Sequence, residues 1–389
     1  MAAARASFFL LTIIYLGFVS LGLPDGTLGV AWPAMYRELG LPIGFAGTII
    51  IIGTVLSAVA ALTSGKTIAR FSTGPVVLVS CLLTGSGMMT IAHTHGVGGL
   101  ILAAVFLGLG AGAVDAALNG YVAKHYTGRH MNWLHACWGI GATCGPLVLA
   151  QVLRSETGWR SGYFGIAVAQ LSLAVVFLLT LGLWKKVHER PIAVAAGAGS
   201  GRQPVAQANS PAGWLSLLIF GIYVGVETTA GLWAGSILVV SRGIAADKAA
   251  ICVAFYYGAI TGGRILVGVV VERWGNRRVI FLGTCVALVG AALFVFAPTV
   301  PLAALALTLV GLGFAPVYPG LMHEVPRRFA PAAVQSVIGR QSGAAALGYA
   351  TLPPAAGWLA ERSLEGIAWG LIAGILALMA VIRRLNRIT

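Results

Sequence analysis

The chain of 389 residues is 58% hydrophobic and only 9% charged, whereas an average soluble chain is about a quarter charged. Water cannot solvate a surface this poor in charge, so the composition excludes a soluble globule and a disordered chain. The net charge of +14 does not indicate nucleic-acid binding, because the basic residues lie in short clusters between long apolar runs. The five cysteines are scattered and give no disulfide framework. The sequence therefore predicts a polytopic protein embedded in a lipid bilayer.

Twelve apolar runs are long enough to cross a bilayer core of about 30 Å, which takes roughly 20 helical residues. A β-barrel would need alternating segments of about ten residues, and runs such as 171–183 are apolar throughout. We therefore expect an all-α fold with twelve membrane-spanning helices. The predicted spans are 8–35, 43–69, 74–94, 98–121, 132–154, 161–184, 214–240, 247–271, 277–297, 300–322, 333–359 and 364–382.

The long gap after the sixth run divides the chain. Residues 185–213 carry Pro191, Pro204 and Pro211 among small and polar residues, with little to bury. The sequence predicts a six-helix bundle at 1–184, a cytoplasmic linker at 185–213 and a second bundle at 214–389. If the N-terminus lies inside, most lysines and arginines fall on the inner side, so we expect both termini in the cytoplasm. We expect a monomer in the inner (cell) membrane.

The two predicted bundles share weak internal similarity. A shift of 203 positions aligns the inner end of the second run with that of the eighth, and a shift of 202 aligns the first run with the seventh. The agreement of two separate landmarks within one residue predicts pseudo-symmetric halves. The matched positions are Gly65 with Gly268, Arg70 with Arg273, Asp25 with Glu227, and Gly29 with Gly231.

The twelve runs, the central linker and one inner loop resemble the major facilitator superfamily, whose signature follows helices 2 and 8. The resemblance implies transport by alternating access of the two halves. In that family the acid and arginines of the loop pair across helix ends and favour the outward-open state, although Ala69 stands where the first copy would carry the acid. The residues of this expected gating loop are Gly268, Glu272, Arg273, Gly275, Arg277 and Arg278.

A narrower resemblance comes from the fourth and tenth runs. The glycine-rich segment from Gly108 to Asn119, with Asp115 inside it, is similar to the L-fucose–proton symporter family. Asp25 in the first run and the segment 315–319 fit the same family. This resemblance implies symport of a hexose-like sugar with protons, with sodium as the alternative ion. The proton gradient would be the driving force, with no bound cofactor.

Only three acidic residues lie deep within the predicted spans, namely Asp25, Asp115 and Glu227. A charge at the bilayer centre costs about 2.5–3.5 kcal/mol, so we expect these acids to couple protons to transport; the alternative is a structural hydrogen bond. Pro24 should kink the first helix and free the carbonyl of Ser20. Glu227 would be a weak proton carrier if a cation paired with it, and Arg340 is the expected partner.

Polar and aromatic residues near these acids form the expected substrate site. Asn119 is four residues after Asp115 on the same helix face, and Trp32 is seven residues after Asp25, where it could stack on a sugar. A stripe in the fifth run and residues of the seventh, tenth and eleventh complete it. The predicted substrate-binding residues are Asp25, Trp32, Asn119, Asn132, His135, Trp138, Tyr223, Tyr318, Arg340 and Gln341.

Of two other functions, an exporter stays open, and the sequence motifs argue against an enzyme. Gly141-x-x-x-Gly145-Pro146 resembles an antiporter motif, which would make the protein a proton-coupled exporter of amphipathic compounds, although close helix packing explains the glycines equally well. The isolated acids form no nucleophile–base pair, and neither a phosphate-binding loop nor a zinc-binding motif occurs. We therefore predict a transporter that is not an enzyme and has no metal site.

Overall fold

The computed structural model describes residues 2–125, 128–154, 158–184 and 206–389. These residues form helices almost throughout, and their only β contact is a single parallel bridge between Ala206 and Phe329. The chain divides into two compact units. We call residues 1–41 and 48–195 the first unit, and residues 42–47 and 196–389 the second unit.

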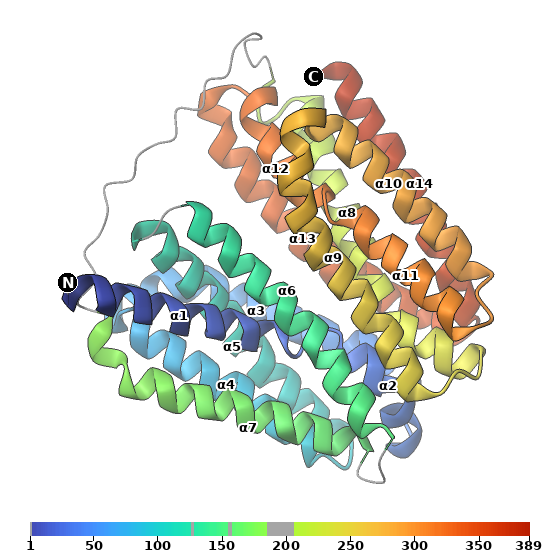
Figure 1. Cartoon of the computed structure of the whole chain (residues 1–389), viewed down its shortest axis with the longest axis horizontal. Helices are drawn as coiled ribbons and strands as arrows, with labels where there is room; N and C mark the ends of the chain where they lie inside the picture. The colour runs from blue at the N-terminus through green and yellow to red at the C-terminus, as the bar shows by residue number, and fades with distance from the viewer. Residues whose placement is uncertain (1, 126–127, 155–157, 185–205) are drawn as a thin grey trace. The chain divides into compact units, whose positions relative to one another are not determined.

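Helices follow one another through short connections in both halves of the chain (Figure 1). The N-terminal half contains α1 (Ala2–Gly22), α2 (Thr27–Glu38), α3 (Phe45–Phe71), α4 (Thr73–Ala92), α5 (Val97–His125), α6 (Gly128–Val152), α7 (Gly158–Leu179) and the 3₁₀ turn η1 (Leu181–Leu183). The C-terminal half contains α8 (Pro211–Ser236), the π-helical segment η2 (Ile237–Ser241), α9 (Ala246–Trp274), α10 (Asn276–Val295), α11 (Val300–Phe314), α12 (Val317–Arg328), α13 (Pro331–Ala360) and α14 (Leu364–Ile388).

The helices have the length and surface of membrane spans. Eleven helical segments of the described residues are long and apolar enough to cross a bilayer, and α13, with 30 residues, adds a twelfth helix of membrane length. Large apolar side chains such as Leu62, Leu179 and Trp358 are at least 74% exposed, and lipid is the solvent that covers such surfaces favourably. The predicted all-α polytopic fold is confirmed.

The first span is broken at residues 23–26, as the sequence predicts. Gly26 has a left-handed φ of 75°, and α2 restarts at Thr27, whose hydroxyl donates to the carbonyl of Pro24 at 2.6 Å. The carbonyl of Ser20, which Pro24 cannot serve, accepts a hydrogen bond of 2.8 Å from the buried Gln170 side chain of α7. A buried amide therefore supports the break, and Asp25 lies within it.

The tenth span is broken in a comparable way. α11 ends at Phe314 and α12 begins at Val317, with Pro316 between them. The backbone carbonyl of Phe314 accepts a hydrogen bond of 3.3 Å from the hydroxyl of Tyr223 on α8, and the two rings meet edge to face. A side chain from a neighbouring helix again donates to a backbone carbonyl at the break.

A polar clasp joins three spans at one end of the first unit. Glu38, at the end of α2, forms an ion pair with Arg160 near the start of α7 and accepts a hydrogen bond of 2.7 Å from Trp159 Nε1. The Arg160 guanidinium also donates to the carbonyl of Thr94, just after α4, at 2.6 Å. The ends of the first, third and sixth spans are thus tied together.

The second unit has an equivalent clasp with the charges exchanged. Here the arginine is Arg242, directly after η2, and the acid is Glu365 at the start of α14; the closest atoms are 2.7 Å apart. Arg242 also donates to the carbonyls of Phe294 and Ala297, at the end of α10, at 2.6 and 3.1 Å. The seventh, ninth and twelfth spans occupy the places of the first, third and sixth, so the internal repeat also holds for these contacts.

Candidate functional site

The site in the first unit begins where α1 and α6 approach closely. A Cβ atom at Gly141 or Gly145 would overlap the backbone carbonyl of Val19 or Leu23, and one at Gly22 would overlap that of Trp138. Only glycine permits this approach, so close packing accounts for the Gly-x-x-x-Gly-Pro segment. The contact also brings Trp138 of α6 to the turn that carries Asp25.

Asp25 is held by a neutral donor. The Trp138 indole Nε1 donates to Asp25 Oδ2 at 2.7 Å. Asp25 is half-buried, and among the described residues it forms no ion pair. The predicted site residues Asp25 and Trp138 are therefore in direct contact, and the partner of the acid carries no charge.

The second acid lies on α5. Asn119 Nδ2 donates to Asp115 Oδ1 and to its backbone carbonyl, each at 3.0 Å. The Asp115 side chain is exposed, and it is near enough to Asp25 for the two carboxyl charges to interact. Among the residues that the structure describes, Asp115 also has no cationic partner. The first unit thus brings two carboxyl groups together with neutral hydrogen-bond donors.

Close packing also fixes the position of α5. A Cβ atom added at Gly108 or Gly112 would overlap the α3 backbone at Gly53 or Ser57, and one at Gly110 would meet α4 at Ser80. The glycines before Asp115 therefore allow two neighbouring helices to approach, as the sequence predicts.

Trp32 is buried, with its side chain 1% exposed and its ring 6.3 Å from that of Tyr36. The turn at 23–26 interrupts the helix between Asp25 and Trp32, and stacking of Trp32 on a solute stays a prediction. His135 is exposed and meets Phe18 edge to face at 5.8 Å, and the side chain of Asn132 lies outside the described residues.

The second unit holds its acid differently. Arg264 NH2 of α9 lies 3.7 Å from Glu227 Oε1 of α8, and the Tyr223 hydroxyl interacts with both groups. The hydroxyl of Tyr256 donates to the Glu227 backbone carbonyl at 2.7 Å. Tyr223 is fully buried, whereas Tyr318 of α12 is half-buried and its ring lies 6.3 Å from that of Tyr223.

Arg340 is not the partner of Glu227, which corrects the pairing expected from the sequence. Its guanidinium donates to the Ala208 carbonyl and to Asn209 Oδ1 at 3.2 and 2.7 Å, at residues just before α8. Gln341 is buried and donates to the hydroxyl of Ser216. Arg264 was the missed residue, and its position inside the predicted eighth span was the available signal, because an arginine there is costly.

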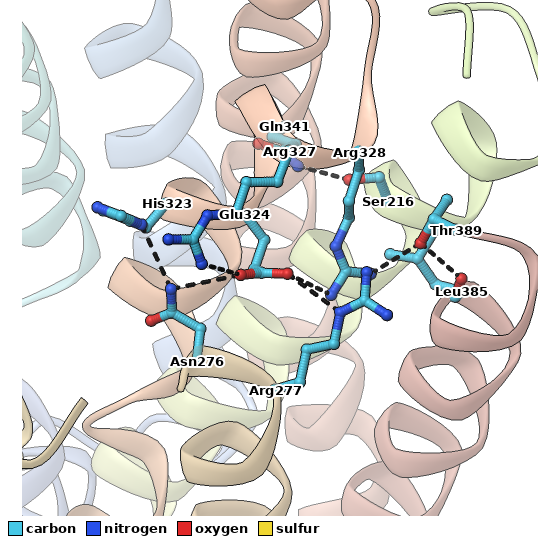
Figure 2. Close-up of polar contacts among 10 residues, drawn as sticks. All are labelled: Ser216, Asn276, Arg277, His323, Glu324, Arg327, Arg328, Gln341, Leu385 and Thr389. Atoms are coloured by element: carbon cyan, nitrogen blue, oxygen red, sulfur yellow. Dashed lines mark hydrogen bonds and ion pairs between the residues drawn. The ribbon is translucent and has the colours of Figure 1, made fainter. Parts of the chain in front are cut away.

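An ionic cluster lies at the other end of α12 (Figure 2). Glu324, of which 4% of the side chain is exposed, lies within 3.5 Å of guanidinium nitrogens of Arg277, Arg327 and Arg328. Asn276 Nδ2 lies 3.4 Å from Glu324 Oε1 and donates to it. Three arginines, from α12 and the start of α10, therefore share one buried carboxylate.

This cluster differs from the gating loop expected from the resemblance. The loop turns at Gly275, which has a φ of 75°, and Arg273 and Arg278 are exposed. The surroundings of Gly268 and the side chain of Glu272 lie outside the described part of the chain. The acid that pairs with Arg277 is Glu324, and its spacing of three and four residues from Arg327 and Arg328 was the signal for it.

No metal site was found in the described parts of the chain. No three histidine, cysteine or acidic side chains there lie together as a metal would require. The cysteines are free thiols, of which Cys81 and Cys252 are buried.

Comparison with known proteins identifies the family. The family description "Major Facilitator Superfamily" matches residues 14–239 and, in a second match, residues 215–387. The chain belongs to the major facilitator superfamily. The two matches together cover residues 14–387. The narrower resemblance to L-fucose–proton symporters is not supported by the comparisons.

Relatives within this superfamily are distant. An uncharacterized transporter from Sinorhizobium fredii is 26% identical over 378 residues, which cover 88% of this chain and 96% of the relative. The niacin transporter NiaP from Acinetobacter baylyi is 24% identical over 313 residues, covering 71% and 70% of the two chains. The crystal structure of the nucleoside transporter NupG is similar in fold, with a TM-score of 0.73, 14% identity and coverage of 98% and 99%. These comparisons support a membrane transporter of a small substrate.

Proposed function

We propose that this transporter is a proton-coupled symporter of a small polyhydroxylated solute, of the size of a hexose, working by alternating access. The observation that carries the proposal is the pair of carboxyl groups in the first unit. Asp25 and Asp115 lie near each other, and each is hydrogen-bonded to a neutral donor. We place the protein in the inner membrane with both termini in the cytoplasm, as a monomer driven by the proton gradient.

Neutral partners suit an acid that gains and loses a proton. An indole or amide donor stays bonded to a carboxyl oxygen in either protonation state, whereas a cation would be left uncompensated when the acid becomes neutral. Two nearby carboxyl charges also repel each other, so a proton on one relieves the other. Asp25 and Asp115 are therefore the proposed proton carriers. Glu227, which faces Arg264, is not assigned this role.

The same groups suit a hydroxylated solute. Asn119 offers both a donor and an acceptor, and Asp25 and Asp115 offer acceptors. Trp138 presents an indole ring beside Asp25, where the apolar face of a sugar can pack. Proton and solute then bind to one group of residues, and each must favour the binding of the other in a symporter.

The exporter function stays the alternative. The glycines of α6 allow the close approach of α1 and α6, and this packing is compatible with either function. The direction of proton movement separates the two functions, because an antiporter moves protons against the substrate and a symporter moves both together.

The test is uptake into proteoliposomes with an imposed pH gradient. Hexoses, pentoses and amphipathic cations are added in turn, and the external pH is recorded in light buffer. We expect alkalinisation outside when a hexose-like solute enters, loss of this signal in Asp115→Asn, and an unchanged signal in Glu361→Gln, which alters an exposed acid at the end of α13. A signal that needs sodium and ignores the pH gradient would contradict proton coupling, and proton release driven by amphipathic cations would indicate the exporter.

A further inference from the structure

A charged pair lies inside the membrane-spanning part of the second unit and has no role in the proton pathway proposed above. The pair is Glu227 on α8 and Arg264 on α9. Their closest nitrogen and oxygen atoms are 3.7 Å apart, beyond the 2.7–2.9 Å typical of charge-assisted hydrogen bonds. The Arg264 guanidinium therefore does not form with Glu227 the short bidentate contact that it can form with a free carboxylate.

Both side chains of the pair are partly exposed. The Arg264 side chain is 27% exposed and that of Glu227 is 13% exposed. Tyrosines lie beside it: the hydroxyl of Tyr256 donates to the Glu227 backbone carbonyl at 2.7 Å, and the ring of Tyr257 lies 5.1 Å from that of Tyr256. Tyr256 is buried, whereas Tyr257 and Tyr318 are half-buried, and half-buried rings can offer apolar faces and hydroxyl groups to a polar solute.

Stability gives a weak reason for such a pair. Each charge is costly in the membrane, and a buried ion pair can often be replaced by apolar residues without loss of stability. Arginine also differs from lysine in its planar fork, which matches the two oxygens of a carboxylate. Arg264 thus has the chemistry of a carboxylate-binding group, and the Glu227 side chain partly occupies the position of the bound carboxylate.

We propose that Arg264 binds the carboxylate of the transported solute and that Glu227 faces this position when no solute is bound. The solute is then a small polyhydroxylated monocarboxylic acid, of the chemical class of the sugar acids. The proposal rests on the proposed function for transport, and it narrows the polyhydroxylated solutes of that function to those that carry a carboxylate. Binding of the solute carboxylate to Arg264 needs no proton gradient, so it can be measured separately from transport.

The experiment measures binding to the purified full-length chain in lipid nanodiscs by isothermal titration calorimetry. The probes are galacturonate and galactose, which differ in a carboxylate against a hydroxymethyl group. Nicotinate and nicotinamide form a second pair that differs in the same charge on another body. We expect the wild type to bind galacturonate tenfold or more tighter than galactose. A preference for nicotinate alone would overturn the sugar-acid class.

Variants assign the preference to Arg264. Arg264→Gln should abolish the preference for the acid over its neutral counterpart. Arg264→Lys should retain part of this preference, because lysine keeps the charge but cannot form the bidentate contact. Glu227→Gln removes the internal competitor and should tighten binding of the acid several-fold. Arg362→Gln, an exposed arginine after α13, is the matched control and should bind as the wild type does. If Arg264→Gln does not fold, the opposite effects of the lysine and Glu227→Gln variants still decide the question.

The outcomes separate this proposal from the proposed function. Equal affinity for acid and neutral probe in both pairs, no binding of either acid, or weaker acid binding in folded Glu227→Gln would overturn the carboxylate site. Proton-coupled uptake of neutral galactose without acid preference would overturn it and leave symport standing. An acid preference that disappears in Arg264→Gln, without proton-coupled uptake in proteoliposomes, would support the site and contradict symport.

Discussion

The close contact between α1 and α6 gives a prediction with a definite sign. A Cβ atom at Gly141 would lie closer than 3.0 Å to the Val19 carbonyl oxygen, a distance that real Cβ atoms essentially never show. Ordinary contact needs about 3.5 Å, so Gly141→Ala must separate the helices by roughly 1 Å or more. The hydrogen bond from Trp138 to Asp25 would then lengthen from 2.7 Å to about 3.7 Å, which breaks it.

Alanine elsewhere should have the opposite effect. Gly165 lies within α7 with open space around its Cβ position, so Gly165→Ala should gain helix stability of up to about 1 kcal/mol. Overpacking at Gly141 should cost about 1–3 kcal/mol, which exceeds the same gain in helix propensity. Gly165→Ala is therefore a control of the same chemistry in the same unit.

The difference in stability between the two purified variants is measured by thermal unfolding, monitored through the labelling of buried cysteines. We expect a lower midpoint than the wild type for Gly141→Ala and an equal or higher one for Gly165→Ala. Gly141→Ala should also lose the proton signal of the uptake assay. If Gly141→Ala were as stable as Gly165→Ala and kept full uptake, the close contact would not position Asp25 and the argument for the site would be refuted.

Three further predictions concern single side chains. Trp138→Phe removes the donor to Asp25, worth about 1.4 kcal/mol, so proton-coupled uptake should fall about tenfold in the proteoliposome assay, while Trp133→Phe, at an exposed tryptophan, should leave it unchanged. Arg242→Leu removes the charged hydrogen bonds of the second clasp and should lower the free energy of unfolding by about 1.5–3 kcal/mol; an unaltered denaturation curve would show that the clasp adds no stability. Glu324→Gln leaves three arginines without their shared carboxylate and should lower the free energy of unfolding by about 3 kcal/mol in the same measurement. Full recovery of this free energy in added salt would contradict the role of the buried carboxylate.

The fold could be predicted from the sequence because the bilayer imposes a simple rule on helix length and polarity. Each expected span contains a helix, and the breaks occur at Pro24 and Pro316, where proline removes a backbone donor. The freed carbonyl of Ser20 was also predictable. Its partner, Gln170, was not, because no local pattern tells which helix will lie beside α1.

The site was predictable only in part, for the same reason. Asp25, Asp115 and Asn119 could be found because polar residues are costly in apolar spans and because i,i+4 neighbours share a helix face. The contact of Asp25 with Trp138 joins residues 113 positions apart, and it depends on glycine packing that sequence does not orient. The wrong partner for Glu227 has the same cause. That inference assumed an arrangement of helices that tertiary packing decides.

The two halves of this transporter hold their matched acids in different ways, and this difference is the physical basis for giving them different roles. Asp25 lies in a helix break and accepts from an uncharged indole, whereas Glu227 lies in an unbroken helix and faces a guanidinium. If Asp25 takes up a proton, no buried cation loses its counter-ion. If Glu227 leaves Arg264, an anion must replace it, and a solute carboxylate is such an anion. The clasps follow the same logic, since Glu38 and Arg242 exchange the sign of the charge while the same spans stay connected. The repeat thus preserves which helices meet and leaves the chemistry at each contact free to differ.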